Sequence, residues 1–302
     1  MSTILMRGIL QQARNNMTPV AVTRMIAGVN GGRLYYFDGS SWSEQQPAGN
    51  VDRNWIGCGI SGDKMIAGAN GGRLYYFDGS SWSEQQPAGN ADRNWFSCGI
   101  SGDKMIAGAH SGRLHYFDGS SWSEQQPAGN ANMSWRSCGI SGDKMIAGVF
   151  GGRLYSFDGS SWSEQQPAGN ANRNWWGCGI SGDKMIAGAY INRLYSFNGT
   201  SWSEQQPAGN ADSLWLGCGI SGDKMIAGIN GGRLYSYDDT SWSEQQPAGN
   251  ADRNWRGAGI SGDEMIAGAF GGRLYSFNGS SWSEQQPAGN VDRNWWGVGI
   301  SI

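Results

Sequence analysis

The chain has 302 residues, including 50 Gly, 16 Trp, 11 Tyr and 9 Phe, and its net charge is −3. So many aromatic residues exclude a disordered chain, because their side chains bury enough apolar surface to offset the entropy lost on ordering. Acidic and basic residues are nearly equal in number, so the sequence does not predict a basic surface that would bind nucleic acid. The longest apolar runs are far shorter than the roughly 18 residues of a membrane-spanning helix.

Residues 1–22 precede the repeats described below and differ from them in sequence. The apolar stretch at residues 4–10 is short and is interrupted by Arg7 and Gly8, which is atypical of a secretory signal. Its apolar residues have helical spacing, although Gly8 disfavours a helix. We expect a short helix capping one face, an oligomerisation arm or an unstructured leader.

Residues 23–302 consist of seven consecutive repeats of equal length. The decapeptide Ser-Trp-Ser-Glu-Gln-Gln-Pro-Ala-Gly-Asn begins at Ser41 and recurs unchanged in every repeat to Ser281. The tetrapeptide Met-Ile-Ala-Gly begins at Met25, Met65, Met105, Met145, Met185, Met225 and Met265. A period of about 40 residues is typical of a β-propeller in which each repeat forms one blade.

Each repeat predicts four short strands. In one repeat these are residues 55–61, 64–68, 73–77 and 82–86. Gly62-Asp63 and Asp78-Gly79 tolerate positive φ and are predicted to form two-residue hairpin turns. The other joints, residues 70–72 and 87–94, are longer. The sequence therefore predicts an all-β fold, a seven-bladed β-propeller with four antiparallel strands per blade.

The order of the strands follows from the space available. The innermost strand crowds the axis and suits small residues such as Gly57, Cys58 and Gly59. The outermost strand carries Trp82 on a polar edge that discourages pairing between molecules.

The chain does not begin and end at the boundaries of a blade. Residue 302 corresponds to position 62 of the repeat, and residue 23 resumes at the next position. We therefore expect residues 294–301 to supply the inner strand of the blade formed by residues 24–46. Residues 18–22 are the alternative for that place.

The segment Ser-Phe-Asp-Gly-Ser-Ser-Trp at residues 156–162 contains the predicted turn between the third and fourth strands. It resembles the Asp-box (BNR) hairpin of sialidase-like and related bacterial propellers, and a matching stretch recurs in all seven repeats. In that family the box is a folding element. The resemblance therefore implies the propeller fold and says little about activity.

The joint before the inner-strand Trp varies between copies at the positions of Arg53 and Asn54, and two further positions of the repeat change strongly. Both belong to the face that carries the second-to-third and fourth-to-first joints, here called the variable face; the face with the tight turns is the constant face. A packed core does not accept Ile, Arg and Trp alike, so we expect these residues to be exposed or to line a mouth. The first set is Asn30, Asn70, His110, Phe150, Tyr190, Asn230 and Phe270, and the second is Ile56, Phe96, Arg136, Trp176, Leu216, Arg256 and Trp296.

Aromatic and Arg side chains supply much of the binding energy at interfaces. The sequence therefore predicts a non-catalytic recognition module that binds a glycan or a protein surface through the variable face. The alternative is neutral drift at tolerant loop sites, which should favour small polar replacements on both faces. For a protein ligand, affinity should centre on Phe150, Trp176, Tyr190, Arg256, Phe270 and Trp296.

Two other functions stay open at this point. A multivalent lectin would have up to seven equivalent sugar sites between blades, built from constant residues such as Trp55, Gln85, Gln86 and Asn90. A repetitive scaffold, engineered or recently amplified, would have no natural ligand.

The sequence predicts no catalytic residue, no metal site and no cofactor. His110 and His115 are the only histidines, and no third ligand accompanies them. We expect His110 to be an exposed loop residue and His115 to replace the Tyr found at the position of Tyr75. Arg33 and its six equivalents are symmetric and are expected to be structural, bonded to loop carbonyls or to the nearby Glu.

The five cysteines, from Cys58 to Cys218, occupy one equivalent position, where Ala258 and Val298 stand in the other two blades. Equivalent inner-strand positions of different blades should not meet, so we expect free thiols that act as small buried apolar groups. Unpaired thiols favour a reducing, cytoplasmic compartment.

Overall fold

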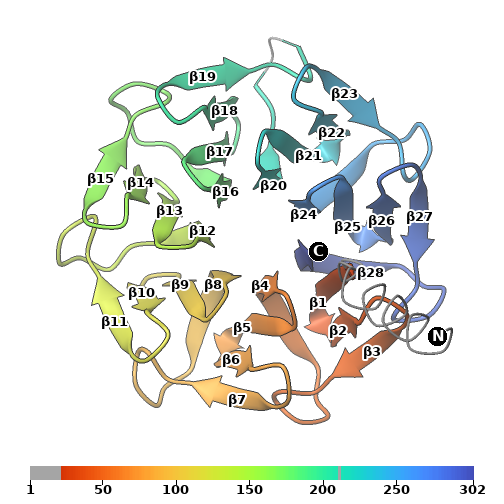
Figure 1. Cartoon of the computed structure of the whole chain (residues 1–302), viewed down its shortest axis with the longest axis horizontal. Helices are drawn as coiled ribbons and strands as arrows, with labels where there is room; N and C mark the ends of the chain where they lie inside the picture. The colour runs from red at the N-terminus through yellow and green to blue at the C-terminus, as the bar shows by residue number, and fades with distance from the viewer. Residues whose placement is uncertain (1–21, 210–211) are drawn as a thin grey trace, which may run out of the picture.

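The computed structural model describes residues 22–209 and 212–302. They form 28 strands, arranged as seven blades of four antiparallel strands around a central channel (Figure 1). The predicted all-β propeller is confirmed. The expectations for the N-terminal segment concern residues outside the described ranges, except Val22. Within the described residues, no helix is long and apolar enough to span a membrane.

In every blade the strands run outward from the channel in sequence order, except where the ring closes. The innermost strands are β4 (Arg53–Ser61), β8 (Arg93–Ser101), β12 (Trp135–Ser141), β16 (Trp175–Ser181), β20 (Trp215–Ser221), β24 (Arg253–Ser261) and β28 (Arg293–Ser301). The second strands are β1 (Arg24–Gly32), β5 (Lys64–Gly72), β9 (Lys104–Ala109), β13 (Lys144–Val149), β17 (Lys184–Ala189), β21 (Lys224–Gly232) and β25 (Glu264–Gly272).

The outer half of each blade is a short hairpin. The third strands are β2 (Leu34–Phe37), β6 (Leu74–Phe77), β10 (Leu114–Phe117), β14 (Leu154–Phe157), β18 (Leu194–Phe197), β22 (Leu234–Tyr237) and β26 (Leu274–Asn278). The outermost strands are β3 (Trp42–Gln45), β7 (Trp82–Gln85), β11 (Trp122–Gln125), β15 (Trp162–Gln165), β19 (Trp202–Gln205), β23 (Trp242–Gln245) and β27 (Trp282–Gln285).

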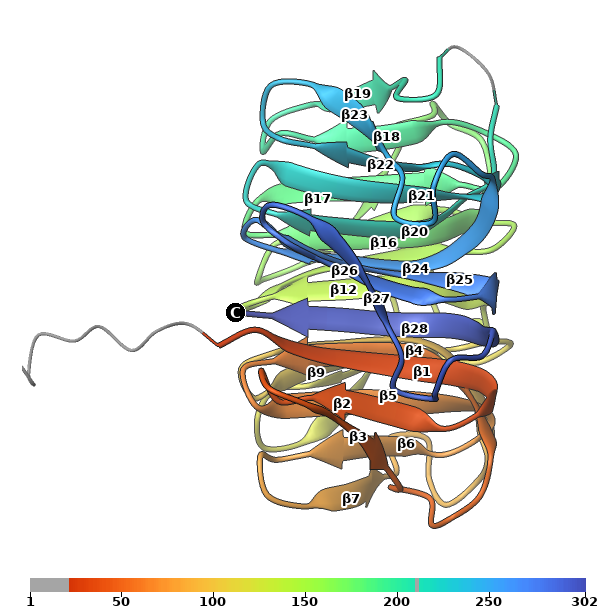
Figure 2. The same cartoon turned by 90° about the vertical axis from the view of Figure 1, so that its right-hand side faces the viewer.

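The two ends of the described chain meet in one blade and close the ring. β28 pairs antiparallel with β1, with Arg24 opposite Ser301 and Ala27 opposite Val298. Figure 2 shows the two strands side by side. The inner strand of the blade that contains β1, β2 and β3 is therefore the C-terminal segment, as the phase of the repeat predicts.

The second strand is longer than predicted in four blades, because it continues into the neighbouring blade's sheet. β5 runs through the expected joint to Gly72, and Asn70 and Gly72 pair with Asn94 and Arg93 of β8. Where the second strand ends earlier, a single bridge such as Gly112 with Met133 makes the same connection. The backbone of the joint thus finds its hydrogen-bond partners in the next repeat.

Only one of the two predicted hairpin turns has two residues. Ser61 pairs with Lys64 around Gly62, which has φ 60°. The other turn has four residues, because Phe77 pairs with Trp82. Here Oδ1 of Asp78 accepts hydrogen bonds from the backbone N–H groups of Ser80 and Ser81, both at 2.8 Å. The aspartate side chain thus organises the turn, and its hydrogen bonds lower its pKa to about 2.

Each blade packs on the next through a buried Trp close to the channel. Trp55 is only 2 % exposed and belongs to the same buried cluster as Ile26 and Leu34 of the preceding blade. A Cβ added to Gly28 would lie 2.7 Å from the Cβ of Trp55, so only glycine permits this approach. A Cβ on Gly57 would lie 3.0 Å from the backbone N of Cys98, which agrees with the prediction of small residues beside the axis.

One turn carries a strained residue that its six equivalents avoid. Asp239 has φ 86°, whereas the equivalent residues, such as Gly79 and Gly199, are glycines with φ near 100°. A side chain in this region of φ costs about 1 kcal/mol or more. We expect Asp239→Gly to raise the free energy of unfolding in urea by about 1 kcal/mol. Asp239→Ala keeps a Cβ and serves as the control that should gain much less; an Asp239→Gly protein no more stable than the parent contradicts the assignment of strain.

Candidate functional site

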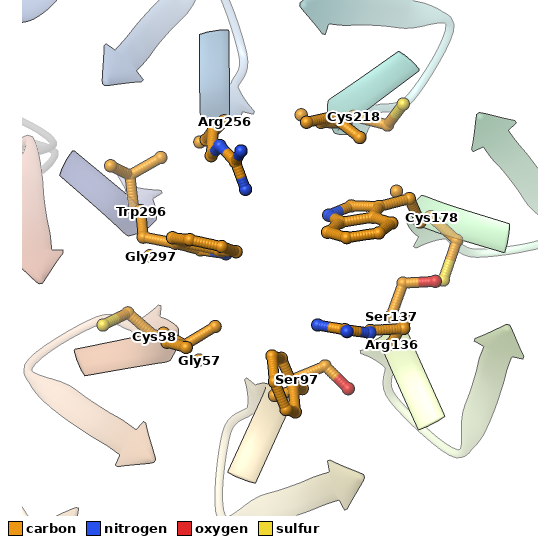
Figure 3. Close-up of a pocket in the computed structure, with 18 of the residues that line it drawn as sticks. Gly57, Cys58, Ser97, Arg136, Ser137, Cys178, Cys218, Arg256, Trp296 and Gly297 are labelled. Atoms are coloured by element: carbon orange, nitrogen blue, oxygen red, sulfur yellow. The ribbon is translucent and has the colours of Figure 1, made fainter. Parts of the chain in front are cut away.

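Seven side chains, one from each innermost strand, line the central channel on the side of the variable face (Figure 3). These channel residues are the second predicted set: Ile56, Phe96, Arg136, Trp176, Leu216, Arg256 and Trp296. They surround a cavity of about 120 Å³.

A β-bulge accounts for the position of the channel residues. In β4, Trp55 pairs with Ala69 and Gly57 pairs with Gly68. Ile56 is therefore an extra residue in β4 that has no partner in β5. The same register shift follows the buried Trp in the inner strand of every blade. Bulges re-aim side chains, and this one turns the residue after the Trp toward the channel while the Trp itself packs between blades.

The first predicted set, here called the rim residues, follows the main ladder of the second strand on the same face. The set comprises Asn30, Asn70, His110, Phe150, Tyr190, Asn230 and Phe270. Four of these, the aromatic ones and His110, contact channel residues through their rings, whereas Asn30, Asn70 and Asn230 belong to neither cluster described next. The structure therefore brings the two predicted sets together on one side of the ring.

A first cluster spans three adjacent blades around Arg136. The Arg136 guanidinium carbon lies 3.8 Å from the ring centroid of Phe96 and 4.5 Å from that of Trp176. Trp176 stacks on Tyr190 with their centroids 5.5 Å apart, and Phe150 meets the Trp176 ring edge to face. The Arg136 cluster comprises Phe96, His110, Arg136, Phe150, Trp176 and Tyr190.

A second cluster lies where the ring closes. The Arg256 guanidinium carbon is 4.3 Å from the ring centroid of Trp296 and 4.8 Å from that of Phe270. The rings of Phe270 and Trp296 meet edge to face at 5.7 Å. These three residues are the Arg256 cluster. Arginine placed over aromatic faces keeps its charge while covering apolar surface.

Two channel residues present little surface. Ile56 and Leu216 are 5 % and 4 % exposed, so their side chains mainly fill space between neighbouring inner strands. They lie in the two stretches of the ring that separate the Arg136 cluster from the Arg256 cluster.

One exposed residue beside the Arg136 cluster is absent from the predicted sets. Ile191 follows Tyr190, is 61 % exposed and has φ 52°. A β-branched residue is rare in this region of φ, and five of its six equivalents are glycine. The sequence does show this difference, because Ile191 stands where most repeats have a glycine in the turn.

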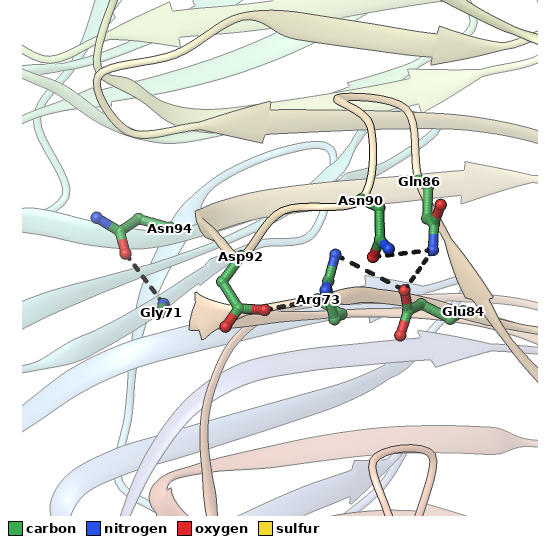
Figure 4. A network of polar contacts seen from close by, with 7 residues as sticks. All are labelled: Gly71, Arg73, Glu84, Gln86, Asn90, Asp92 and Asn94. Atoms are coloured by element: carbon green, nitrogen blue, oxygen red, sulfur yellow. Dashed lines mark hydrogen bonds and ion pairs between the residues drawn. The ribbon is translucent and has the colours of Figure 1, made fainter.

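The constant residues proposed as contacts of a multivalent lectin are engaged inside the protein. Trp55 is buried, and Oε1 of Gln85 accepts a hydrogen bond from Nε1 of Trp122 in the next blade at 3.0 Å. Nε2 of Gln86 donates to Glu84 at 2.8 Å, and it also lies 3.4 Å from Oδ1 of Asn90 (Figure 4). Equivalent Trp-to-Gln hydrogen bonds connect all seven pairs of neighbouring outer strands.

The symmetric arginines have a structural role, as predicted. Nε of Arg73 lies 2.8 Å from Oδ1 of Asp92, and its guanidinium also reaches Glu84 at 3.8 Å (Figure 4). The pairing with Glu recurs in all seven blades. In five of them the arginine also pairs with an Asp and so connects the outer hairpin to the joint that follows it.

The two histidines lie in different environments. His115 is 4 % exposed and packs against Trp95, in agreement with its predicted role as a replacement for tyrosine. Burial lowers its pKa to about 4. His110 is partly buried rather than exposed, because its ring meets that of Phe96. Among the described residues, no group of three His, Cys, Asp or Glu side chains could bind a metal ion.

All five cysteines are free thiols, as predicted. Cys98 and Cys138 are buried, whereas Cys58, Cys178 and Cys218 are partly exposed, which differs from the expectation of uniformly buried groups. Desolvation raises the pKa of each thiol well above its ordinary value. At neutral pH these groups are protonated and weakly nucleophilic.

Comparison with known proteins identifies the fold and no closer relationship. No protein-family model and no curated protein matches the chain. Among solved structures, the chain resembles the computationally designed Ika8 protein with a TM-score of 0.60 and 12 % identity over 89 % of this chain and 85 % of that one.

Two natural proteins show a similar level of resemblance. YCF48, in a structure bound to D1 peptide, has a TM-score of 0.59 and 14 % identity over 82 % of this chain and 85 % of that one. The β-propeller domain of Cps50 (Swd1) from Myceliophteria thermophila has a TM-score of 0.55 and 12 % identity over 81 % of this chain and 89 % of that one. These likenesses establish the β-propeller architecture.

Proposed function

We propose that this protein is a non-catalytic recognition module that binds one peptide or protein segment at the channel mouth of the variable face. The observation that carries the proposal is the pair of aromatic–arginine clusters that the two diversified sets form on one face of the ring. Partly exposed Trp, Tyr, Phe and Arg side chains, grouped rather than scattered, are the composition of an interface hot spot.

The distribution of change between repeats supports the proposal. Drift at tolerant loop sites yields replacements that need not interact, whereas nine of the fourteen diversified residues contact one another in the two clusters. The constant face carries repeated turns and ion pairs between blades, such as Lys64 with Asp103. The Asp-box-like turns lie on that face and act as structural elements.

The structural neighbours agree with this class of function. YCF48 has been solved with a bound peptide, and a propeller of the same architecture is a natural platform for such a ligand. A multivalent lectin is less favoured, because its proposed contacts are occupied by hydrogen bonds between blades and within each repeat.

Panning a displayed library of random linear peptides against the immobilised protein tests the proposal. Selected peptides should bind with a stoichiometry near one in calorimetric titration. Changing Trp176, Tyr190 and Trp296 together to Ala should reduce binding to background with little change in melting temperature. The fold tolerates smaller side chains at these positions, since other blades carry Ile56 and Leu216 at the channel position and Asn30 at the rim position of Tyr190.

A matched control uses rim positions outside the clusters. Changing Asn30, Asn70 and Asn230 together to Ala alters the same face and should leave affinity within about twofold. Unchanged affinity in the Trp176, Tyr190 and Trp296 variant, or a stoichiometry near seven, would reject the proposed mouth as the binding site.

A further inference from the structure

The described residues at the channel mouth include two arginines and no acidic side chain. Arg136 and Arg256 project into the channel from strands on different sides of the ring (Figure 3). None of the described residues that line this cavity is Asp or Glu. The mouth therefore carries two positive charges without local compensation.

Neither guanidinium is satisfied within the described part of the protein. The Nε atoms of Arg136 and Arg256 are both buried without a hydrogen-bond acceptor. The symmetric arginines differ in their charge partner: each also has one buried terminal nitrogen without an acceptor, but Arg33 and its equivalents all pair with a carboxylate. Buried or partly buried charges in proteins are normally paired, because leaving a desolvated charge without a partner is costly.

The electrostatics of the site agree with this geometry. Burial lowers the pKa of the Arg136 guanidinium, and the charge of Arg256 adds to the effect. Mutual repulsion of two cations in one cavity is relieved when an anion enters between them. The aromatic rings beside each guanidinium, Phe96 and Trp176 at Arg136 and Phe270 and Trp296 at Arg256, restrict its orientation and exclude water, which strengthens bidentate hydrogen bonds to an oxyanion.

From this arrangement we infer that the channel mouth binds a carboxylate or phosphate group of the ligand between Arg136 and Arg256. The inference rests on the proposed function and specifies which chemical group of the peptide enters the channel. A cavity of about 120 Å³ accepts a single such group and excludes a folded domain. The flanking part of the peptide then lies over the aromatic rings of the two clusters.

The first experiment uses small anions and needs no peptide. Sodium acetate and inorganic phosphate are titrated into ¹⁵N-labelled protein while the Arg Nε–Hε resonances are followed by NMR. The signals of Arg136 and Arg256 should shift saturably, and the variants Arg136→Leu and Arg256→Leu should each weaken the anion at least tenfold. Leu is the natural residue at the equivalent position 216, so both variants should fold.

Arg53→Gln is the matched control, because Arg53 is exposed on the same face and lies outside the cavity. It should leave anion affinity within twofold of the parent. Equal weakening by Arg53→Gln and Arg136→Leu, or the absence of any saturable shift, would overturn the inference by showing only diffuse attraction.

A second experiment identifies the source of the anion. Each peptide from the panning is compared with its C-terminal amide, with versions in which Glu or Asp becomes Gln or Asn, and with a phosphoserine version. A tenfold loss for the amide assigns the terminal carboxylate, a similar loss for Gln or Asn assigns a side chain, and a tenfold gain for phosphoserine assigns a phosphate. Peptides that bind equally well in every form overturn the inference but leave the proposed function intact. If acetate or phosphate binds between Arg136 and Arg256 but no peptide binds, the anion site stands and the proposed function is rejected.

Discussion

Removing residues 290–302 is expected to lower the free energy of unfolding by more than about 5 kcal/mol, which corresponds to a fall in melting temperature of more than about 10 °C. The deletion removes β28, which is the inner strand of the closing blade and pairs with β1 and β25. It also removes Trp295, which is 2 % exposed in the core shared with Met25 and Tyr35. Loss of one such Trp side chain alone costs about 3–5 kcal/mol.

The ring topology amplifies this loss. Each blade contacts only its two neighbours, so an opened ring exposes the edge of β1 and the packing face of the blade before it. Thermal unfolding followed by circular dichroism measures the effect. Deletion of Ile302 alone, which is 45 % exposed, is the control that should leave the melting temperature unchanged. A shortened chain that melts within a few degrees of the parent contradicts closure by β28.

The free energy of unfolding is expected to fall by about 3 kcal/mol between pH 6.5 and pH 4 because of His115, and replacing His115 by Tyr is expected to remove this fall. Burial lowers the pKa of His115 from 6.5 to about 4 in the folded protein. Between these values the unfolded chain binds a proton that the folded chain does not, so stability falls as pH falls. Above pH 6.5 both states are neutral and the contribution is fully present.

The repeats supply the replacement and its control. The six equivalents of His115 are tyrosines in the same packing position, such as Tyr75, which is 8 % exposed against Trp55. His115→Tyr should therefore fold and show a flatter stability profile in urea between pH 7 and pH 4.5. His110→Asn copies the residue at three other rim positions and should keep most of the slope. If the free energy of unfolding of His115→Tyr changes with pH as steeply as that of the parent, burial does not lower the pKa of His115 and the prediction is wrong.

The repeat length and its phase were sufficient to predict the architecture. A period of about 40 residues with four strand-like segments specifies the blade. The offset between residues 23 and 302 specifies which strand closes the ring. The sequence of one repeat does not reveal contacts with the next one. The pairing of Asn70 with Asn94, and hence the extension of β5, depends on how neighbouring blades approach one another.

The candidate site could be predicted as a set of positions but not as an arrangement. Alternation along the inner strand does not reveal the bulge that directs Ile56 and its equivalents into the channel. From the sequence, Leu216 and Trp176 are equivalent channel residues. In the structure Leu216 is buried, whereas Trp176 stacks on Tyr190. Which residues meet across blades depends on side-chain size and direction, and these are fixed only in three dimensions.

The crystal structure of the complex with a peptide selected by panning tests the central claim most directly. The peptide should lie over the channel on the variable face, contact Trp176 and Trp296, and place an acidic group between Arg136 and Arg256. A peptide seated on the constant face, or repeated in the grooves between blades, would contradict a single diversified mouth as the site of recognition.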